Sequence, residues 1–145
     1  MANKKPASLI IYGASLGGNV ALRTAEEIKG KIPMSHIIIE SSFVSYQGIA
    51  RNMLSRSWIT WLFQPLSYLV LSDKWAPTDI SMFAPTRMLF LTGDQDPVIA
   101  PENSKKMFEL AKEPKQFWII PGGNHGNLYE VNNGELRQRL IEYLK

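Results

Sequence analysis

Three loops in this sequence carry side chains that could together perform nucleophilic catalysis. The first holds Ser15 within the letters GASLG, the second holds Asp94 and Asp96, and the third holds His125 within the letters PGGNHG. A serine hydroxyl is a weak nucleophile until a base lies within hydrogen-bond reach. Histidine can supply that base, and a carboxylate then orients its ring and stabilises the cation that forms.

The surroundings of Ser15 predict a sharp turn between a strand and a helix. Residues 7–12 form a short apolar run, and residues 16–29 have the spacing of a helix. A turn this tight strains the serine backbone and leaves little room for neighbouring side chains. We therefore expect Gly13 and Gly17 to relieve clashes at the turn.

The same turn would prepare a place for negative charge. The backbone N–H of Leu16 would stand beside the serine as an oxyanion donor, and the start of the helix adds its positive end. Gly18 would let this helix pack closely on the strand. G-x-S-x-G also occurs in ordinary glycine-rich turns, so its weight here comes from the strand before it, the helix after it and the partners downstream.

Two aspartates compete for the role of the orienting acid. Asp94 and Asp96 both follow a strand predicted over residues 86–92, and both qualify by position. We favour Asp96, because it lies further past the strand end and Pro97 fixes the turn after it. We expect Asp94 to cap that turn.

The two histidines of the chain have different settings. His125 follows a strand predicted over residues 116–120, in a glycine-flanked loop at the edge of the sheet where Ser15 emerges. His36 begins a strand predicted over residues 36–40, on the side away from the strand ends. We therefore assign His125 as the general base and expect His36 to be structural.

Strands alternate with helices along the chain, which predicts a single α/β domain over residues 1–145 with a parallel sheet. In such sheets, sites form at the carboxyl ends of the strands. The first strand is apolar on both faces, which predicts a central strand covered by helices on both sides. Further helices are predicted over residues 101–111 and 134–144. The helix residues expected to face the core are Leu16, Val20, Ala21, Ile28, Phe108 and Leu110.

Residues 41–85 are too long for a simple connection in a compact α/β unit. Their apolar clusters, interrupted at Pro65, predict two or more helices, so we expect residues 44–81 to form a helical cap. The most apolar stretch, residues 58–71, contains polar residues and is shorter than a bilayer span needs. A helix that lies on a membrane surface is the alternative interpretation of that stretch.

Composition narrows the function classes further. The 145 residues carry a net charge of +3 and are 45% hydrophobic, and they include no cysteine. A disulfide framework and a thiolate metal site are therefore excluded. The basic residues are scattered rather than arranged in a stripe, which argues against nucleic-acid binding. The polar start shows no secretory signal, and a cytoplasmic location is expected.

Four stretches carry a resemblance to a known family: residues 11–18, 40–46, 93–98 and 110–125. The sequence resembles the C-terminal portion of the α/β-hydrolases, and more narrowly the bacterial serine-aminopeptidase-like hydrolases. The resemblance implies a nucleophile at Ser15, a triad acid at Asp96, a base at His125 and an oxyanion N–H at Leu16. It implies that no metal or organic cofactor is needed.

The chain departs from that family at its start. An α/β-hydrolase has several strands and a helix ahead of the nucleophile turn, whereas eight residues precede Leu9 here. The N-terminal strands would supply the second oxyanion donor and the neighbour of the nucleophile strand. We therefore expect a partial fold that looks truncated, with an exposed strand edge and little or no activity on its own.

Two functional hypotheses remain. In the first, the chain is a serine hydrolase acting on an ester, thioester or amide of a small molecule or peptide with an apolar group. In the second, it is a non-catalytic half-domain that self-associates or binds a partner through its exposed strand edge. The other polar residues near the strand ends have ordinary interpretations: turn or cap bonding for Ser41 and Ser42, a structural hydrogen bond for Glu40, and shaping of the histidine loop for Asn124 and Asn127.

Overall fold

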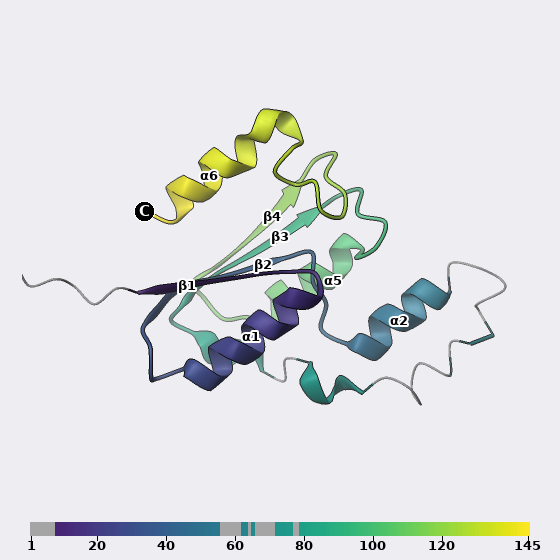
Figure 1. Cartoon of the computed structure of the whole chain (residues 1–145), viewed down its shortest axis with the longest axis horizontal. Helices are drawn as coiled ribbons and strands as arrows, with labels where there is room; N and C mark the ends of the chain where they lie inside the picture. Colours follow the sequence, from purple (N-terminus) through teal and green to yellow (C-terminus); the bar gives the residue numbers. More distant parts are fainter. Residues whose placement is uncertain (1–7, 56–61, 64, 66–71, 77–78) are drawn as a thin grey trace, which may run out of the picture.

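The computed structural model describes residues 8–55, 62–63, 65, 72–76 and 79–145 (Figure 1). Its centre is a four-stranded sheet in the order β1-β2-β3-β4, with every neighbouring pair parallel. The strands are β1 (Leu9–Ala14), β2 (Met34–Glu40), β3 (Arg87–Gly93) and β4 (Lys115–Ile120). The predicted parallel α/β sheet is therefore confirmed.

Helices connect these strands and cover both faces of the sheet. The α-helices are α1 (Leu16–Ile28), α2 (Tyr46–Leu54), α5 (Pro101–Leu110) and α6 (Glu135–Tyr143), and the 3₁₀ turns are η1 (Asp73–Trp75), η2 (Ile80–Phe83) and η3 (Asn132–Gly134). In Figure 1, α6 lies above the sheet, and α1 and α5 lie below it. None of the described helices is long and apolar enough to cross a membrane.

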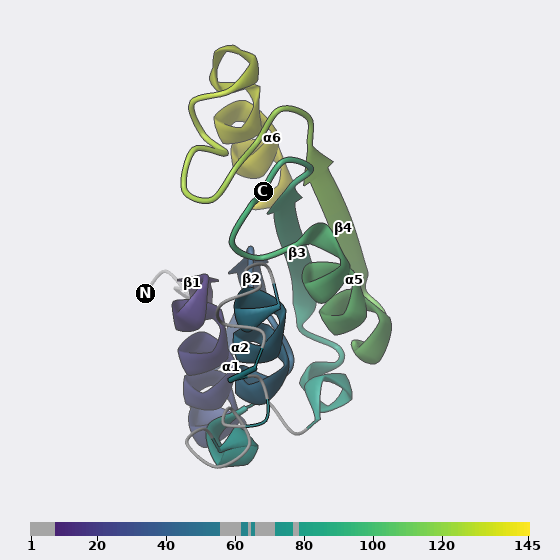
Figure 2. The same ribbon diagram turned by 90° about the vertical axis from the view of Figure 1, so that its right-hand side faces the viewer.

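Alternate residues of the strands feed two separate hydrophobic cores. Ile37 and Ile39 of β2 pack with α1 and α5, whereas Ile38 packs with the residues beneath α6. Because successive strand side chains point to opposite faces, an apolar run such as the isoleucines of β2 serves both cores at once. Figure 2 shows the strands side by side in the order β1 to β4, with α5 beside β3 and β4.

The interpretation of β1 as a centrally placed strand is wrong for the described sheet. β1 pairs with β2 alone, so it forms an edge. Ile11 and Gly13 are buried on the side of α1, but Ile10 and Tyr12 on the other side are 43% and 45% exposed. The reason is that α6 reaches β2, β3 and β4 and leaves that face of β1 uncovered.

Two helix faces also differ from the sequence expectation. Leu16 and Val20 of α1 are 57% and 56% exposed, because Leu22 and Ala25 occupy the stripe that meets the sheet. Leu110 of α5 is likewise 55% exposed, and its inward position is taken by Met107. Ala21 is buried, and Ile28 and Phe108 pack on the core as expected.

Asp73 of η1 connects the two ends of the predicted cap by bonding to the start of α2. Ser45 caps α2 by accepting a hydrogen bond from the Gly48 N–H at 2.9 Å. Asp73 of η1 accepts hydrogen bonds from the Ser45 hydroxyl and the Tyr46 N–H, each at 2.7 Å. Most of residues 56–71, including Trp58 and Trp61, lies outside the described residues, so the cap stays a prediction.

Candidate active site

Ser15 occupies a strained turn between β1 and α1. Its backbone has φ 53° and ψ −126°, a region that residues with a side chain rarely adopt. Its hydroxyl makes no capping hydrogen bond to α1, although serine at a helix start ordinarily does so. Its N–H donates to the Glu40 carbonyl at 2.8 Å. The backbone of Ser15 is thus fixed, while its hydroxyl is not used to end the helix.

The glycines at this turn have unequal roles. A Cβ on Gly13 would lie 2.3 Å from the Gly17 carbonyl oxygen and 2.6 Å from the Cβ of Ala21. A Cβ on Gly18 would lie 2.5 Å from the Ser42 hydroxyl oxygen and 3.1 Å from Cγ2 of Ile39, so this glycine lets α1 pack closely on β2 and its following residues rather than on β1 as expected. A Cβ on Gly17 would meet no described atom within 4 Å, so packing does not explain this glycine.

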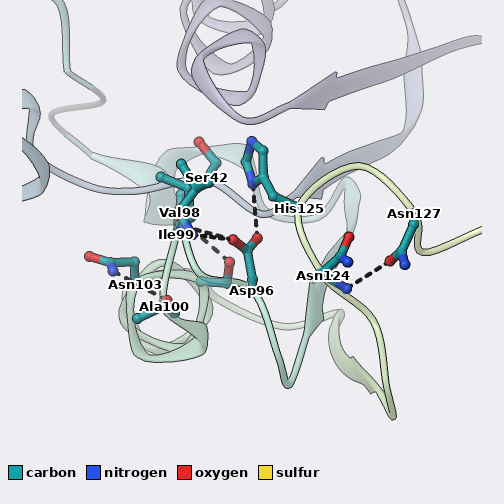
Figure 3. Close-up of polar contacts among 10 residues, drawn as sticks. Ser42, Asp96, Val98, Ile99, Ala100, Asn103, Asn124, His125 and Asn127 are labelled. Carbon is teal, nitrogen blue, oxygen red and sulfur yellow. Dashed lines mark hydrogen bonds and ion pairs between the residues drawn. The ribbon is translucent and has the colours of Figure 1, made fainter. Parts of the chain in front are cut away.

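Asp96 and His125 are in direct contact across the ends of β3 and β4. The Asp96 Oδ2 and the His125 Nδ1 are 2.9 Å apart. The other oxygen, Oδ1, accepts the N–H groups of Val98 and Ile99, each at 2.8 Å (Figure 3). Asp96 is 6% exposed, so these three bonds fix a buried carboxylate. A carboxylate that accepts a hydrogen bond from the Nδ1–H of His125 leaves Nε2 without a proton, so Nε2 can act as a base.

Backbone contacts lock the two loops that carry this pair. A Cβ on Gly93 would lie 2.2 Å from the Gly123 carbonyl oxygen, so the two chains touch at glycines. That same carbonyl accepts the Gln95 N–H at 2.9 Å. Asp94 accepts the Gly122 N–H at 2.7 Å and so joins the two loops. The turn that we expected Asp94 to cap is capped by Asp96, which accepts the N–H groups of Val98 and Ile99.

Asparagine side chains and the second histidine also match their expected roles. Asn127 Oδ1 accepts the Asn124 N–H at 2.7 Å and closes the histidine loop (Figure 3). His36 is 6% exposed and packs edge-on against Tyr143, with ring centroids 5.2 Å apart. Burial lowers the pKa of His36, which favours its neutral form in this structural position.

The structure brings the predicted residues to one edge of the sheet without joining all of them. Ser15, Asp96 and His125 each lie just past the carboxyl end of a strand, and Leu16 begins α1 beside the serine. In the described part of the chain, no hydrogen bond joins Ser15 to His125. Figure 3 shows the second ring nitrogen of His125 turned away from Asp96. Among the described residues, no group of three His, Asp or Glu side chains is placed to share a metal ion.

Comparison with known proteins places this geometry in context. No protein-family model matches the chain. The uncharacterized protein YfhR of Salmonella typhimurium is 32% identical over 154 residues, covering 99% of this chain and 49% of the relative. The YfhR of Escherichia coli K12 is 28% identical over 140 residues, covering 96% of this chain and 46% of the relative. The chain thus spans about half the length of the curated relatives it matches.

Solved structures decide the fold. The α/β hydrolase GrgF from a Penicillium species superposes with a TM-score of 0.63 at 17% identity, covering 94% of this chain and 62% of that one. The chain carries part of the α/β-hydrolase fold. A thermophilic esterase from Thermogutta terrifontis gives a TM-score of 0.59 at 18% identity, covering 94% of this chain and 64% of the esterase. A monoacylglycerol lipase from Paleococcus ferrophilus gives 0.60 at 18% identity, with coverages of 94% and 68%.

The structural hydrogen bond expected for Glu40 is confirmed, and its carboxylate is buried. Glu40, at the end of β2, is 5% exposed, and the Tyr12 hydroxyl donates a hydrogen bond to its carboxylate. Burial raises the pKa of the Glu40 carboxyl, and the charge of Asp96 acts in the same direction. The Tyr12 hydrogen bond and the charge of His125 oppose that rise. The position of Glu40 at a strand end indicates in the sequence that it lies near the site, whereas its hydrogen bond with Tyr12 is not predictable from the sequence.

The interpretation of Ser41 and Ser42 as turn-bonding serines is wrong for their hydroxyls. Both hydroxyl oxygens are buried and have no hydrogen-bond partner in the described residues. Ser41 adopts a left-handed conformation, with φ 43°, and uses its N–H on the Leu91 carbonyl at 2.8 Å. The Ser42 side chain is instead turned beneath α1, against Gly18. The Ser42 hydroxyl therefore packs against α1 instead of forming a hydrogen bond within its own turn.

Proposed function

We propose that this chain carries the catalytic residues of a serine hydrolase that cleaves an ester, thioester or amide bond. Ser15 is the nucleophile, His125 the general base and Asp96 the acid that orients it. The observation that carries this proposal is the Asp96–His125 hydrogen bond at 2.9 Å, at the same edge of the sheet as a serine with φ 53° whose hydroxyl does not cap its helix. An ordinary capping serine would have neither the strained backbone nor the idle hydroxyl.

The mechanism follows from the roles of these groups. His125 takes the proton of Ser15 through Nε2 as Oγ attacks the substrate carbonyl, and Asp96 stabilises the imidazolium that results. The negative charge on the carbonyl oxygen faces the Leu16 N–H at the start of α1. The imidazolium then gives its proton to the leaving group, and an acyl-serine remains. Water, activated by His125, hydrolyses the acyl-serine and restores the enzyme. Hydrogen bonds between nucleophile and base are often long before substrate binds, so their length in the free protein does not oppose these roles.

The described cap residues favour a substrate with an apolar group. Leu62 and Phe63 are 73% and 54% exposed. They lie in the segment expected to form the cap, and a cap with exposed apolar side chains would suit an acyl chain or an apolar side chain of a peptide. The sequence pattern of residues 58–71 supports the same substrate class.

The rate of this chain alone is expected to be low. The second oxyanion donor of the fold comes from a loop that precedes the nucleophile strand. The four described strands include none beyond β1. Loss of one oxyanion donor lowers the rate by roughly 10²- to 10³-fold.

A fluorophosphonate probe, which reacts with an activated serine, tests the proposal. We expect covalent labelling of the purified chain, measured by intact mass, and no labelling of Ser15→Ala or His125→Ala. Ser42→Ala, which changes another serine near the strand ends, is the matched control and should label like the parent. If a folded parent stays unlabelled, or if Ser15→Ala still labels, the proposed role of Ser15 is wrong.

A second function is favoured by the exposure of β1. Its outer edge has no partner strand in the described sheet, and Leu9, Ile10 and Tyr12 are each about two-fifths exposed, at 39%, 43% and 45%. Unpaired strand edges with apolar side chains promote pairing with another chain. We propose as the alternative that two copies of the chain associate through β1.

A further inference from the structure

Three residues outside the proposed triad meet on one face of the sheet, beside the strand ends. In the β1–β2 register, Tyr12 lies opposite Ile38, and Ala14 lies opposite Glu40. Tyr12 and Glu40 are therefore diagonal neighbours on the same face, within reach of a long side chain. The Tyr12 hydroxyl donates to the Glu40 carboxylate. The Tyr129 hydroxyl lies 3.4 Å from the Tyr12 hydroxyl and completes the cluster.

Two of these residues are close in sequence to a proposed catalytic group, and the third is hydrogen-bonded to one. Tyr12 precedes Ser15 on β1 by three positions, and Tyr129 follows His125 by four positions in the loop after β4. Glu40 contributes its main-chain carbonyl to the Ser15 N–H at 2.8 Å. The cluster thus links the serine and histidine elements, although β2 and β3 separate β1 from β4 in the sheet.

Glu40 is a costly residue for a purely structural position. It is 5% exposed, and a buried carboxyl without a full set of partners costs more than an apolar residue of similar size. Its neighbours are the titratable groups of the site: Tyr12, Tyr129, Asp96 and His125 all interact with it electrostatically. Buried acids with such neighbours occur at functional sites more often than elsewhere.

Both tyrosines are suited to remain hydrogen-bond donors. Burial raises the pKa of Tyr12 and of Tyr129 above the ordinary tyrosine value, so their hydroxyls keep their protons. Tyr129 also packs on the core beneath α6, which holds its ring in place. The cluster is therefore a polar contact between β1, which precedes Ser15, and the loop of His125.

We propose that Tyr12, Glu40 and Tyr129 form a positioning bridge that holds the His125 loop in register with the Ser15 turn. This inference rests on the proposed hydrolase function and assigns positioning residues to it. None of the three touches the reacting atoms. They act on the reaction by fixing the distance and angle between Ser15 Oγ and His125 Nε2. Small misplacements of such groups lower reaction rates strongly.

The first experiment measures the rate of fluorophosphonate labelling of Ser15 in folded variants. Glu40→Ala removes one end of the bridge, Tyr12→Phe removes its central hydroxyl, and each should slow labelling by about tenfold. Glu40→Gln keeps an oxygen that accepts the Tyr12 hydroxyl, so it should restore the rate to within about threefold of the parent. Tyr143→Phe changes the last residue of α6, a tyrosine that packs on the same core as Tyr129, and as the matched control it should leave the rate unchanged.

A second readout does not depend on labelling. The His125 Nδ1 proton, which is shared with Asp96, gives an NMR signal whose exchange with water reports how firmly the ring is held. This signal should broaden in Glu40→Ala and Tyr129→Phe but not in Tyr143→Phe. If the parent is not labelled, the hydrolase proposal fails while this signal still judges the bridge. If folded Glu40→Ala and Tyr129→Phe match the parent in both the labelling rate and the His125 signal, the bridge is wrong.

Discussion

The acid–base side of the candidate site and the serine side differ in how much of the described chain supports them. Asp96 and His125 lie in the loops that follow the neighbouring strands β3 and β4, and these loops touch at Gly93 and Gly123. Ser15 directly follows β1, which has one partner strand and one uncovered face. The acid–base pair is therefore built from contacts within these residues, whereas the nucleophile turn has support on one side of its strand.

The two sides of the site therefore depend on different kinds of contact in this chain, which has part of the α/β-hydrolase fold: local contacts within a turn, and long-range contacts between elements. The strained backbone conformation of Ser15 is set by neighbouring residues in the turn between β1 and α1, so it depends on local contacts. The placement of β1 against the rest of the sheet depends on β2, on α1 and on the Tyr12–Glu40–Tyr129 bridge. Substitutions on the two sides should accordingly change different measurements.

The largest effect is expected for the acid. Asp96→Asn keeps the size of the side chain but removes the charge that orients His125 and stabilises its cation. We expect the rate of Ser15 labelling to fall on the order of 10³- to 10⁴-fold. Asp94→Asn, an exposed position bonded to the Gly122 N–H, is the matched control and should stay near the parent rate. Equal losses in the two variants would show that Asp96 is not the triad acid.

The glycine contact between the two loops should give the next largest effect. Gly93→Ala would place a Cβ 2.2 Å from a backbone oxygen, so the loops must separate. We expect a loss of about 1–3 kcal/mol in the free energy of unfolding by urea. Gly17→Ala, where a Cβ meets nothing within 4 Å, should be neutral or stabilising by up to about 1 kcal/mol, because alanine favours helix. A Gly93→Ala protein as stable as its parent would contradict the locked-loop interpretation.

The parts that the sequence predicted are those that depend on local patterns. The apolar run of β2, the strand ends that carry Asp96 and His125, and the glycine turn at Ser15 were all readable from neighbouring residues. The close pairing of Asp96 with His125 followed because parallel strands end at the same edge.

The missed features depend on which face of each element is covered. The spacing within α1 did not show that Leu16 and Val20 lie outside the contact stripe, and β1 read as a buried strand because its uncovered face is apolar. The Tyr12–Tyr129 contact joins residues separated by 117 positions, and the diagonal contact of Tyr12 with Glu40 depends on the strand register. A single sequence does not specify that register, since a slip of one residue would turn Tyr12 to the opposite face.

The uncovered face of β1 provides a test of the alternative function. Ile10→Lys places a charge on this face, and lysine at a strand edge opposes pairing with another chain. If two copies associate through β1, the dissociation constant from sedimentation should rise about tenfold, which corresponds to about 1.4 kcal/mol. Ile141→Lys changes an isoleucine of α6 that is 59% exposed and should leave association unchanged. Equal effects at both positions, or a parent that stays monomeric, would contradict association through β1.

The smallest expected effect is the pH dependence contributed by Glu40. Because burial raises its pKa in the folded protein, the folded state holds this proton more tightly than the unfolded state does. Glu40 therefore makes stability fall as the pH rises from the ordinary value of 4.5 through the raised folded pKa. Glu40→Gln cannot ionise, so its free energy of unfolding, measured by urea at a series of pH values, should lack this decline. Glu109→Gln on α5 is the exposed control and should follow the parent. A decline that persists in Glu40→Gln would mean that Glu40 ionises as easily in the folded chain as in the unfolded one, and that its burial beside His125 and Asp96 carries no electrostatic cost.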